Sequence, residues 1–308
     1  MYTQFIQDTI NEALRLGKEV IPMGSVATYI PELGKADKNA LGIAVNTKNG
    51  EIFTAGDWEK RFSIQSISKV ISLCTALEKC GYNAVFDRVG MEPSGEAFNS
   101  IVELDLVSGK PYNPVINSGA IAIEDLLLTR CTFTELLEIS RKLCKDKKIA
   151  LDEKVYSSEM ANCSRNRAIS WLLKSKGFLD NDVEDVLRLY TAMCSLSVNA
   201  LSLANFGLIL SNDGVDPETG TRLLSSSTVR ITKTIMLTCG MYDGSGQFAV
   251  EVGLPTKSGV GGGLLSVADK EMGIGIYGPS LDNKGNCIAG TTMLKYLSAQ
   301  FDLHIFHP

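Results

Sequence analysis

Histidine is nearly missing from this chain of 308 residues, and its scarcity narrows the kinds of active site that the fold can hold. The two histidines, His304 and His307, both lie among the last few residues. A Ser-His-Asp or Cys-His site in the body of the fold is therefore not expected, and neither is a zinc site built on histidine. If the chain carries out acyl transfer, a lysine or a tyrosine must serve as the base.

The sequence also lacks long apolar runs, an excess of basic charge and paired cysteines. No apolar run reaches the roughly 20 residues of a membrane span, and the first residues show neither the basic nor the apolar region of a signal peptide. The net charge of -5 and the pI near 5.3 argue against nucleic acid or an anionic membrane as a partner. The eight cysteines are scattered, as is typical of reduced thiols. We therefore expect a cytoplasmic protein.

The chain does have an ordinary globular composition, without a repeat, a linker or a low-complexity tract. Apolar runs on either side of an Asn49-Gly50 turn predict a hairpin, and helical periodicity predicts helices through the middle of the chain. The expected strands are 41–47, 51–56, 248–250, 255–260, 264–268 and 272–277. The expected helices are about 3–18, 63–80, 117–130, 134–144, 164–176, 182–194, 200–210, 225–237 and 290–300.

This order of elements predicts an α+β sandwich, whose antiparallel sheet is built from both ends of the chain. N- and C-terminal helices would flank the sheet, and a mostly helical subdomain would be inserted into it. We expect one domain over 1–308, with a sheet-containing half at 1–65 and 215–308 and a helical half at 66–214. A cleft between the two halves would be the natural place for an active site.

The first candidate for chemistry is Ser66, the only serine that has a lysine three positions later, Lys69. Ser63 would cap a buried helix that ends at Gly81, so Ser66 and Lys69 would share one helix face. A serine hydroxyl needs a neighbouring base, and burial near a helix N-terminus would lower the lysine pKa from about 10.4. The alternative is a core helix in which serine and lysine meet by chance.

The second candidate is the glycine-rich stretch 257–263. Its glycines would let the backbone approach a ligand closely, and the amides of Val260 and Ser66 would form a two-donor oxyanion hole. The alternative is a bulged strand followed by a glycine-rich turn. A Ser-x-x-Lys helix with a later Lys-Ser-Gly strand resembles the fold of serine β-lactamases and penicillin-binding proteins.

Within that fold, the sequence is similar to the bacterial-type glutaminases, which hydrolyse L-glutamine to L-glutamate and ammonia. The motifs that carry the resemblance span nearly the whole chain. They are 27–31, 62–69, 92–95, 98–100, 113–117, Glu159, 165–166, 238–242, 253–255 and 257–263. The chain departs from the expected pattern at Ser118 and Thr256, where alanine is expected, and at Cys287, where serine is expected.

The resemblance implies a role for each matched residue. Ser66 would be the nucleophile, Lys69 its base, and Tyr242 a catalytic residue that shuttles a proton to the leaving ammonia. Glu159 suits the α-ammonium of glutamine, and asparagines and tyrosines suit its carboxylate and amide. Lys257 and Ser258 are either catalysts or supports of the strand. The implied substrate-binding residues are Tyr29, Ser66, Asn117, Glu159, Asn166, Tyr190, Tyr242 and Val260.

The resemblance further implies no cofactor, no metal and a homo-oligomer, either a tetramer or a dimer, with L-glutamine as its small-molecule substrate. Two other functions remain open at this point. One is a β-lactamase or D-alanyl-D-alanine peptidase of the same fold, although such enzymes need an export signal. The other is a non-catalytic protein that binds glutamine or supports an assembly, against which the intact Ser66 and Lys69 argue.

Overall fold

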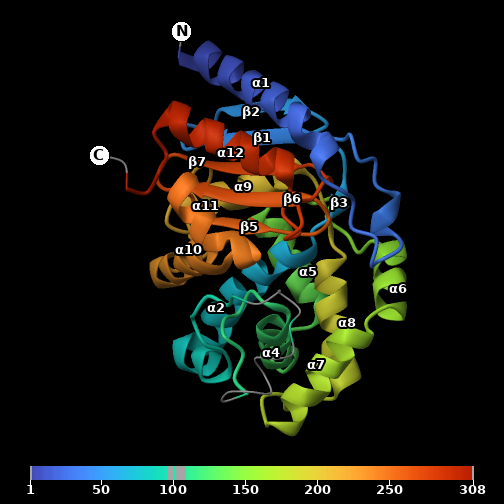
Figure 1. Ribbon diagram of the computed structural model, residues 1–308. Helices are drawn as coiled ribbons and strands as arrows, with labels where there is room; N and C mark the ends of the chain where they lie inside the picture. Colours follow the sequence, from blue (N-terminus) through green and yellow to red (C-terminus); the bar gives the residue numbers. More distant parts are fainter. Residues whose placement is uncertain (1, 96–99, 101–108, 307–308) are drawn as a thin grey trace.

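The computed structural model describes residues 2–95, 100 and 109–306, and it brings both ends of the chain into one sheet (Figure 1). Five antiparallel strands lie in the order β2, β1, β7, β6, β5. Their bounds are β1 Gly42–Thr47, β2 Ile52–Gly56, β5 Thr256–Ser258, β6 Gly263–Ala268 and β7 Met272–Tyr277. Because β1 pairs with β7, the N-terminal hairpin of β1 and β2 is hydrogen bonded to the C-terminal strands. The hairpin turns at Gly50, whose φ is 81°.

Helices pack on both faces of the sheet (Figure 1). α1 (Tyr2–Val20) and α12 (Ile288–Phe301) pack against each other on one side, and α9 (Ala200–Ser211) packs against β7, β6 and β1. Two glycines of β7 allow α9 to lie so close. A Cβ atom at Gly273 would lie 2.1 Å from the Ala204 carbonyl oxygen, and one at Gly275 would lie 1.9 Å from the Ala200 carbonyl oxygen. Any other residue would push the helix off the sheet.

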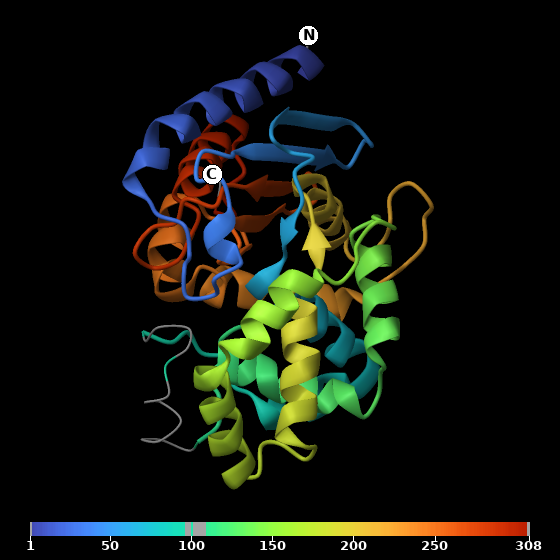
Figure 2. The same ribbon diagram turned by 90° about the vertical axis from the view of Figure 1, so that its right-hand side faces the viewer.

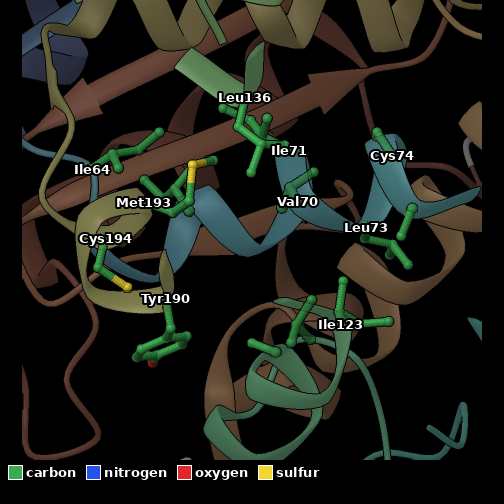
Figure 3. Close-up of a cluster of buried hydrophobic side chains, with 14 of the residues drawn as sticks. Ile64, Val70, Ile71, Leu73, Cys74, Ile123, Leu136, Tyr190, Met193 and Cys194 are labelled. Carbon is green, nitrogen blue, oxygen red and sulfur yellow. The ribbon is translucent and has the colours of Figure 1, made fainter. Parts of the chain in front are cut away.

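The middle of the chain forms a helical half that lies beside the sheet (Figures 1 and 2). α2 runs through its centre, and the residues from Ser68 to Leu77 are all buried. Figure 3 shows Val70 and Ile71 of α2 with Ile123, Leu136 and Met193 in one apolar cluster. Apart from α1, α9 and α12, the α-helices of the described residues are α2 Ser68–Arg88, α4 Asn117–Leu128, α5 Phe133–Leu143, α6 Glu153–Ala161, α7 Ser164–Ser175, α8 Val183–Cys194, α10 Ser226–Cys239 and α11 Ser245–Glu251. The division of the chain at residues 65 and 215 remains a prediction, and α9 lies inside the predicted helical range although it packs on the sheet.

The start of the Ser66 helix differs from the prediction. Ser63 is not its cap, because Ser63 lies in β3 (Phe62–Ser63), which pairs with β4 (Ser197–Val198). The helical backbone instead begins with a tight turn, η3 (Gln65–Ile67), and continues as α2. Gly81 does leave helical geometry, with φ of 83°, but helical turns resume after it and run to Arg88.

Two other elements were assigned wrongly. The expected strand at 248–250 is part of α11, where Phe248 is buried and Val250 is 79 % exposed, so burial follows a helical period. The helix α6 was missed altogether. Asp152 was the available signal for it, because its carboxylate accepts hydrogen bonds from the backbone amides of Lys154 and Val155 and so caps the helix.

Cys287, one of the departures from the family pattern, caps α12. Its Sγ accepts a hydrogen bond from the Gly290 amide at 3.1 Å, so the thiol takes the place of the expected serine hydroxyl. Thr256 also uses its additional hydroxyl, which lies 2.7 Å from the Ser266 hydroxyl across the β5–β6 pair. Both departures therefore serve the scaffold.

Glu124 is a buried carboxylic acid that joins α4 to α2. It is 2 % exposed, and its Oε1 accepts a hydrogen bond from the Ser72 hydroxyl at 2.5 Å. Its Oε2 has no partner among the residues that the structure describes. Burial raises the pKa of Glu124 from its ordinary 4.5 to about 7, and the Ser72 hydrogen bond opposes the rise. The group therefore keeps its proton in the folded protein under mildly acidic conditions.

The raised pKa of Glu124 predicts a loss of stability as the pH rises. Between about pH 4.5 and 7 the unfolded chain ionises this group and the folded chain does not, so stability falls by about 3 kcal/mol and stays lower above pH 7. Glu124→Gln cannot ionise. Its free energy of unfolding relative to wild type should therefore rise by about 3 kcal/mol between pH 4.5 and 8. Urea denaturation measures this difference, with the surface variant Glu138→Gln as control; a difference that does not change with pH would contradict the assignment.

Candidate active site

Ser66 lies in the tight turn η3 that leads into α2 and is 6 % exposed. An amide in the first turn of a helix has no carbonyl partner within that helix. The glycine-rich stretch 257–263 runs against this turn, since a Cβ atom at Gly259 would lie 2.8 Å from the Ile64 carbonyl oxygen and 3.5 Å from the Ser66 nitrogen. The two stretches that the sequence singled out are therefore neighbours in space.

Lys69 is held in a buried chain of polar contacts. It is 2 % exposed, and its Nζ donates a hydrogen bond to Asn117 Oδ1 at 2.6 Å. Asn117 Nδ2 in turn donates to Asn166 Oδ1 at 2.9 Å, and the Tyr190 ring centroid lies 5.8 Å from Lys69 Nζ. Burial lowers the pKa of Lys69 to about 8, against the opposing effects of Cys194 and Glu159. A substantial fraction of Lys69 is therefore neutral near pH 8.

A pocket opens in front of Ser66, and six of the eight predicted substrate-binding residues line it. Its lining comes in part from the turn η3 before α2 and from the helices α4, α6, α7 and α8. The six are Tyr29, Ser66, Asn117, Glu159, Asn166 and Tyr190, and the others that line it are Ile30, Gln65, Asn162, Cys163 and Arg165. The remaining two predicted residues, Tyr242 and Val260, lie outside this lining. Val260 lines a neighbouring groove, which it shares with Tyr29.

Glu159 is the acidic group of the pocket. It lies on α6, is 6 % exposed and accepts a hydrogen bond from Gln65 Nε2 at 3.3 Å. Burial raises its pKa to about 7, and Gln65 and Lys69 oppose the rise. A carboxylate that has lost its water gains free energy from a cation placed next to it.

Tyr242 begins the tight turn η4 (Tyr242–Gly244) and contacts Ser66 although it does not line the pocket. Its φ is 55°, a left-handed conformation that costs a residue with a side chain about 1–2 kcal/mol. The Tyr242 hydroxyl donates to the Ser258 carbonyl oxygen at 3.2 Å and is hydrogen bonded to the Ser66 side chain. Burial raises the pKa of Tyr242, which therefore keeps its proton at neutral pH.

Lys257 lies on β5 and contacts residues 240–245 around Tyr242, which we call the Tyr242 segment. It is fully buried, and its Nζ donates to the carbonyl oxygens of Ser258 at 2.6 Å and Gly240 at 3.3 Å. The same Nζ lies 4.5 Å from the Tyr242 ring centroid. Burial and repulsion from Lys69 lower the pKa of Lys257 well below its ordinary range. Of the two roles that the sequence left open, these contacts favour support.

Five residues of the lining were not among the predicted site residues, and one of them, Gln65, donates a hydrogen bond to Glu159. Besides Glu159 it donates to Ser63 Oγ at 3.3 Å, and its φ of 50° is another left-handed value. Its position next to Ser66, within the motif 62–69, was the only available signal. The predicted motif 98–100 falls largely outside the described residues, as do the other residues between 96 and 108 except Ser100.

Comparison with known proteins gives the family of this chain. The glutaminase family model matches residues 24–306, which is most of the chain. The chain belongs to the glutaminase family. Glutaminase 2 of Clostridium perfringens is 48 % identical to it over 305 residues, covering 98 % of this chain and 100 % of that protein. A glutaminase of Clostridium botulinum is 49 % identical over 290 residues, covering 93 % of this chain and 95 % of that protein.

Solved structures of glutaminases superpose on almost the whole chain. The probable glutaminase ybaS matches with a TM-score of 0.93 and 37 % identity, covering 98 % of both chains. The covalent complex of the Bacillus subtilis glutaminase YbgJ with 5-oxo-L-norleucine, formed by reaction with 6-diazo-5-oxo-L-norleucine, matches with a TM-score of 0.89 and 34 % identity, covering 97 % and 99 %.

These matches confirm the family, the enzyme class and the α+β fold of the β-lactamase type that the sequence predicted. The chain is thus a glutaminase-type amide hydrolase. Among the described residues, no helix is both long and apolar enough to cross a membrane.

Proposed function

We propose that this chain hydrolyses L-glutamine to L-glutamate and ammonia through a glutamyl ester on Ser66. The observation that carries the proposal is that Ser66 and the acidic Glu159 line one pocket, while the partly neutral Lys69 is hydrogen bonded to Asn117 of the same lining. The YbgJ complex supports it, because there a diazo ketone has reacted covalently with a glutaminase of similar structure.

In the first half of the reaction, neutral Lys69 accepts the proton of Ser66 Oγ, and Ser66 Oγ attacks the side-chain carbonyl carbon of glutamine. The amides of Ser66 and Val260 stabilise the oxyanion of the tetrahedral intermediate. The C–N bond then breaks, and the proton held by Lys69 passes through Tyr242 to the nitrogen, which leaves as ammonia. In the second half a water molecule loses its proton to Lys69 and adds to the ester carbon. The bond from that carbon to Ser66 Oγ then breaks, Lys69 returns the proton to Oγ, and glutamate is released.

The pocket holds glutamine by its α-carbon groups. The Glu159 carboxylate pairs with the α-ammonium, and this pair compensates for the desolvation of the buried acid. Asn117, Asn166, Tyr29 and Tyr190 offer donors and acceptors for the α-carboxylate and the scissile amide. The anchors therefore set the distance between the α-carbon and Ser66.

Turnover of three substrates side by side tests the proposed function. Ammonia release from L-glutamine, with much less from L-asparagine and no opening of a chromogenic β-lactam, is the expected pattern. Opening of the β-lactam would favour the penicillin-recognising enzymes of the same fold, and absence of turnover on all three would favour a binding or assembly protein.

Glu159→Gln should weaken glutamine binding and leave the protein folded. A hydrogen bond to a charged group contributes about 1.5–3 kcal/mol, so kcat/KM for glutamine should fall about ten- to a hundredfold. Asparagine, one methylene shorter, should already be about a hundredfold poorer in wild type, because its amide cannot reach Ser66 from the same anchors. Steady-state kinetics on both amides measure this. The control is Glu153→Gln, an exposed acid in the first turn of the same helix; equal effects of the two variants would show that the α-ammonium is bound elsewhere.

We further propose a cytoplasmic homo-oligomer, a tetramer or a dimer. All eight cysteines are free thiols and seven of them are buried, which fits a reducing compartment. Light scattering coupled to gel filtration measures the mass of the assembly directly.

A further inference from the structure

The turn at 282–286 lies outside the pocket lining and makes hydrogen bonds to the Tyr242 segment. Asn286 is 3 % exposed, and its Nδ2 donates a hydrogen bond to the Met241 carbonyl oxygen at 3.2 Å. Because a carbonyl can only accept, this bond sets which end of the Asn286 amide faces Met241. Lys284 Nζ donates to the Asp243 carbonyl oxygen at 3.4 Å. The turn thus holds the residue before Tyr242 and the residue after it.

The turn is itself rigidly built. Asp282 Oδ1 accepts hydrogen bonds from the backbone amides of Lys284 and Asn286, each at 2.9 Å. The Asp282 amide donates to the Asn286 carbonyl oxygen at 2.8 Å, which closes the loop. Leu281, just before the turn, exchanges two backbone hydrogen bonds of 2.9 Å with Ser25. Asn286 is therefore fixed in place by bonds that do not involve Tyr242.

The left-handed backbone at Tyr242 is strained. Such a conformation persists only where surrounding contacts stabilise it, so the Tyr242 segment needs hydrogen bonds from its neighbours. Inside the segment, the Ser245 hydroxyl donates to the Tyr242 carbonyl oxygen at 2.7 Å and accepts from the Met241 amide at 3.0 Å. These bonds shape the segment but come from its own helix, α11. Only contacts from another element can set where the segment lies relative to Ser66.

We infer that Asn286 is a positioning residue, which places the Tyr242 hydroxyl next to Ser66 by holding the Met241 carbonyl group. The inference rests on the proposed function of Tyr242 in proton transfer. Asn286 does not line the pocket in front of Ser66, so it acts on the reaction through Tyr242 and does not touch the substrate.

The matched pair Asn286→Ala and Asn283→Ala tests this role within one turn. Asn283 is exposed, so its variant should keep kcat within about twofold of wild type. Asn286→Ala should lower kcat about tenfold or more and change KM little, because a displaced proton donor slows the reaction without removing an anchor of the substrate. A rise of KM at unchanged kcat would overturn the inference.

Combination with Tyr242→Phe shows whether Asn286 acts through Tyr242. If it does, Asn286→Ala should have little further effect in the Tyr242→Phe background. The same fold-loss in both backgrounds would overturn the inference, whereas a fully active Tyr242→Phe would overturn the proposed role of Tyr242 instead. Should Asn286→Ala not fold, Lys284→Met removes the second contact and should show the same non-additivity with a smaller loss.

A spectroscopic readout is independent of catalysis. With 3-fluorotyrosine placed at position 242, the ¹⁹F resonance should shift or broaden in Asn286→Ala and remain unchanged in Asn283→Ala. Identical ¹⁹F spectra for Asn286→Ala and wild type would show that Asn286 does not set the position of the tyrosine, whatever the kinetics.

Discussion

Ser66→Ala is expected to reduce glutamine turnover by at least about four powers of ten, because removal of a nucleophile that works as a unit with its base leaves only binding and the oxyanion donors. Ser66 is the one serine that lies both in the pocket and in hydrogen-bonding contact with Tyr242 among the described residues. Ammonia release from L-glutamine by the purified variant measures the loss. Ser72→Ala removes a buried hydroxyl two helical turns further along and should keep its activity.

The Ser66→Ala protein should still bind its substrate. The hydroxyl is not one of the anchors that we assign to the α-carbon groups, so glutamine should raise the melting temperature of the variant as a ligand of the native state does. This separates loss of chemistry from loss of fold. Substantial turnover by a folded Ser66→Ala protein would exclude the glutamyl ester on Ser66.

Lys69→Arg is expected to be nearly inactive, and the wild-type pH profile should identify Lys69 as the base. Arginine keeps the positive charge but does not give up its proton in the relevant range. Because burial lowers the pKa of Lys69 to about 8, about one molecule in ten has a neutral amine at pH 7. The kcat/KM for glutamine should therefore rise by at least about tenfold from pH 6 to pH 7, because Glu159, with its pKa of about 7, must ionise over the same range, and it should level off above about pH 8.

The pH range of this loss distinguishes a lysine base from a carboxylate base. A lysine base loses activity as acid protonates it below pH 8, whereas an ordinary carboxylate would still be ionised at about pH 5. Constant kcat/KM from pH 8 down to pH 5 would therefore contradict the assignment. Lys79→Met, an exposed lysine on the same helix, is the control and should leave both the rate and the profile unchanged.

Much of the fold follows from local patterns. The hairpin at Asn49-Gly50 formed because a left-handed glycine suits a tight turn between strands, and the expected strands 264–268 and 272–277 are the antiparallel pair β6 and β7. Long periodic segments such as 182–194 and 290–300 gave helices within one or two residues of the prediction. The errors arose where neighbouring elements compete for the chain, as at Ser63, which pairs with β4 instead of capping a helix.

By itself, the sequence determined the family and which residues we propose for the chemistry. The spacing of Ser66 and Lys69, the stretch 257–263 and the motifs around Asn117, Glu159 and Tyr242 were sufficient to identify the family and to name the residues that we propose for the site. Side-chain type and spacing decide such assignments, because a serine nucleophile needs a base within reach and few residue types can serve.

Only the tertiary structure decided the properties of those residues. The pKa of Lys69 falls because helices from across the chain exclude water from it, and Glu159 meets Gln65 over a separation of 94 residues. The left-handed Tyr242 is held by Asn286 and Lys257, which lie on different elements. Desolvation and backbone strain depend on everything that packs around a group, and no local pattern contains that information.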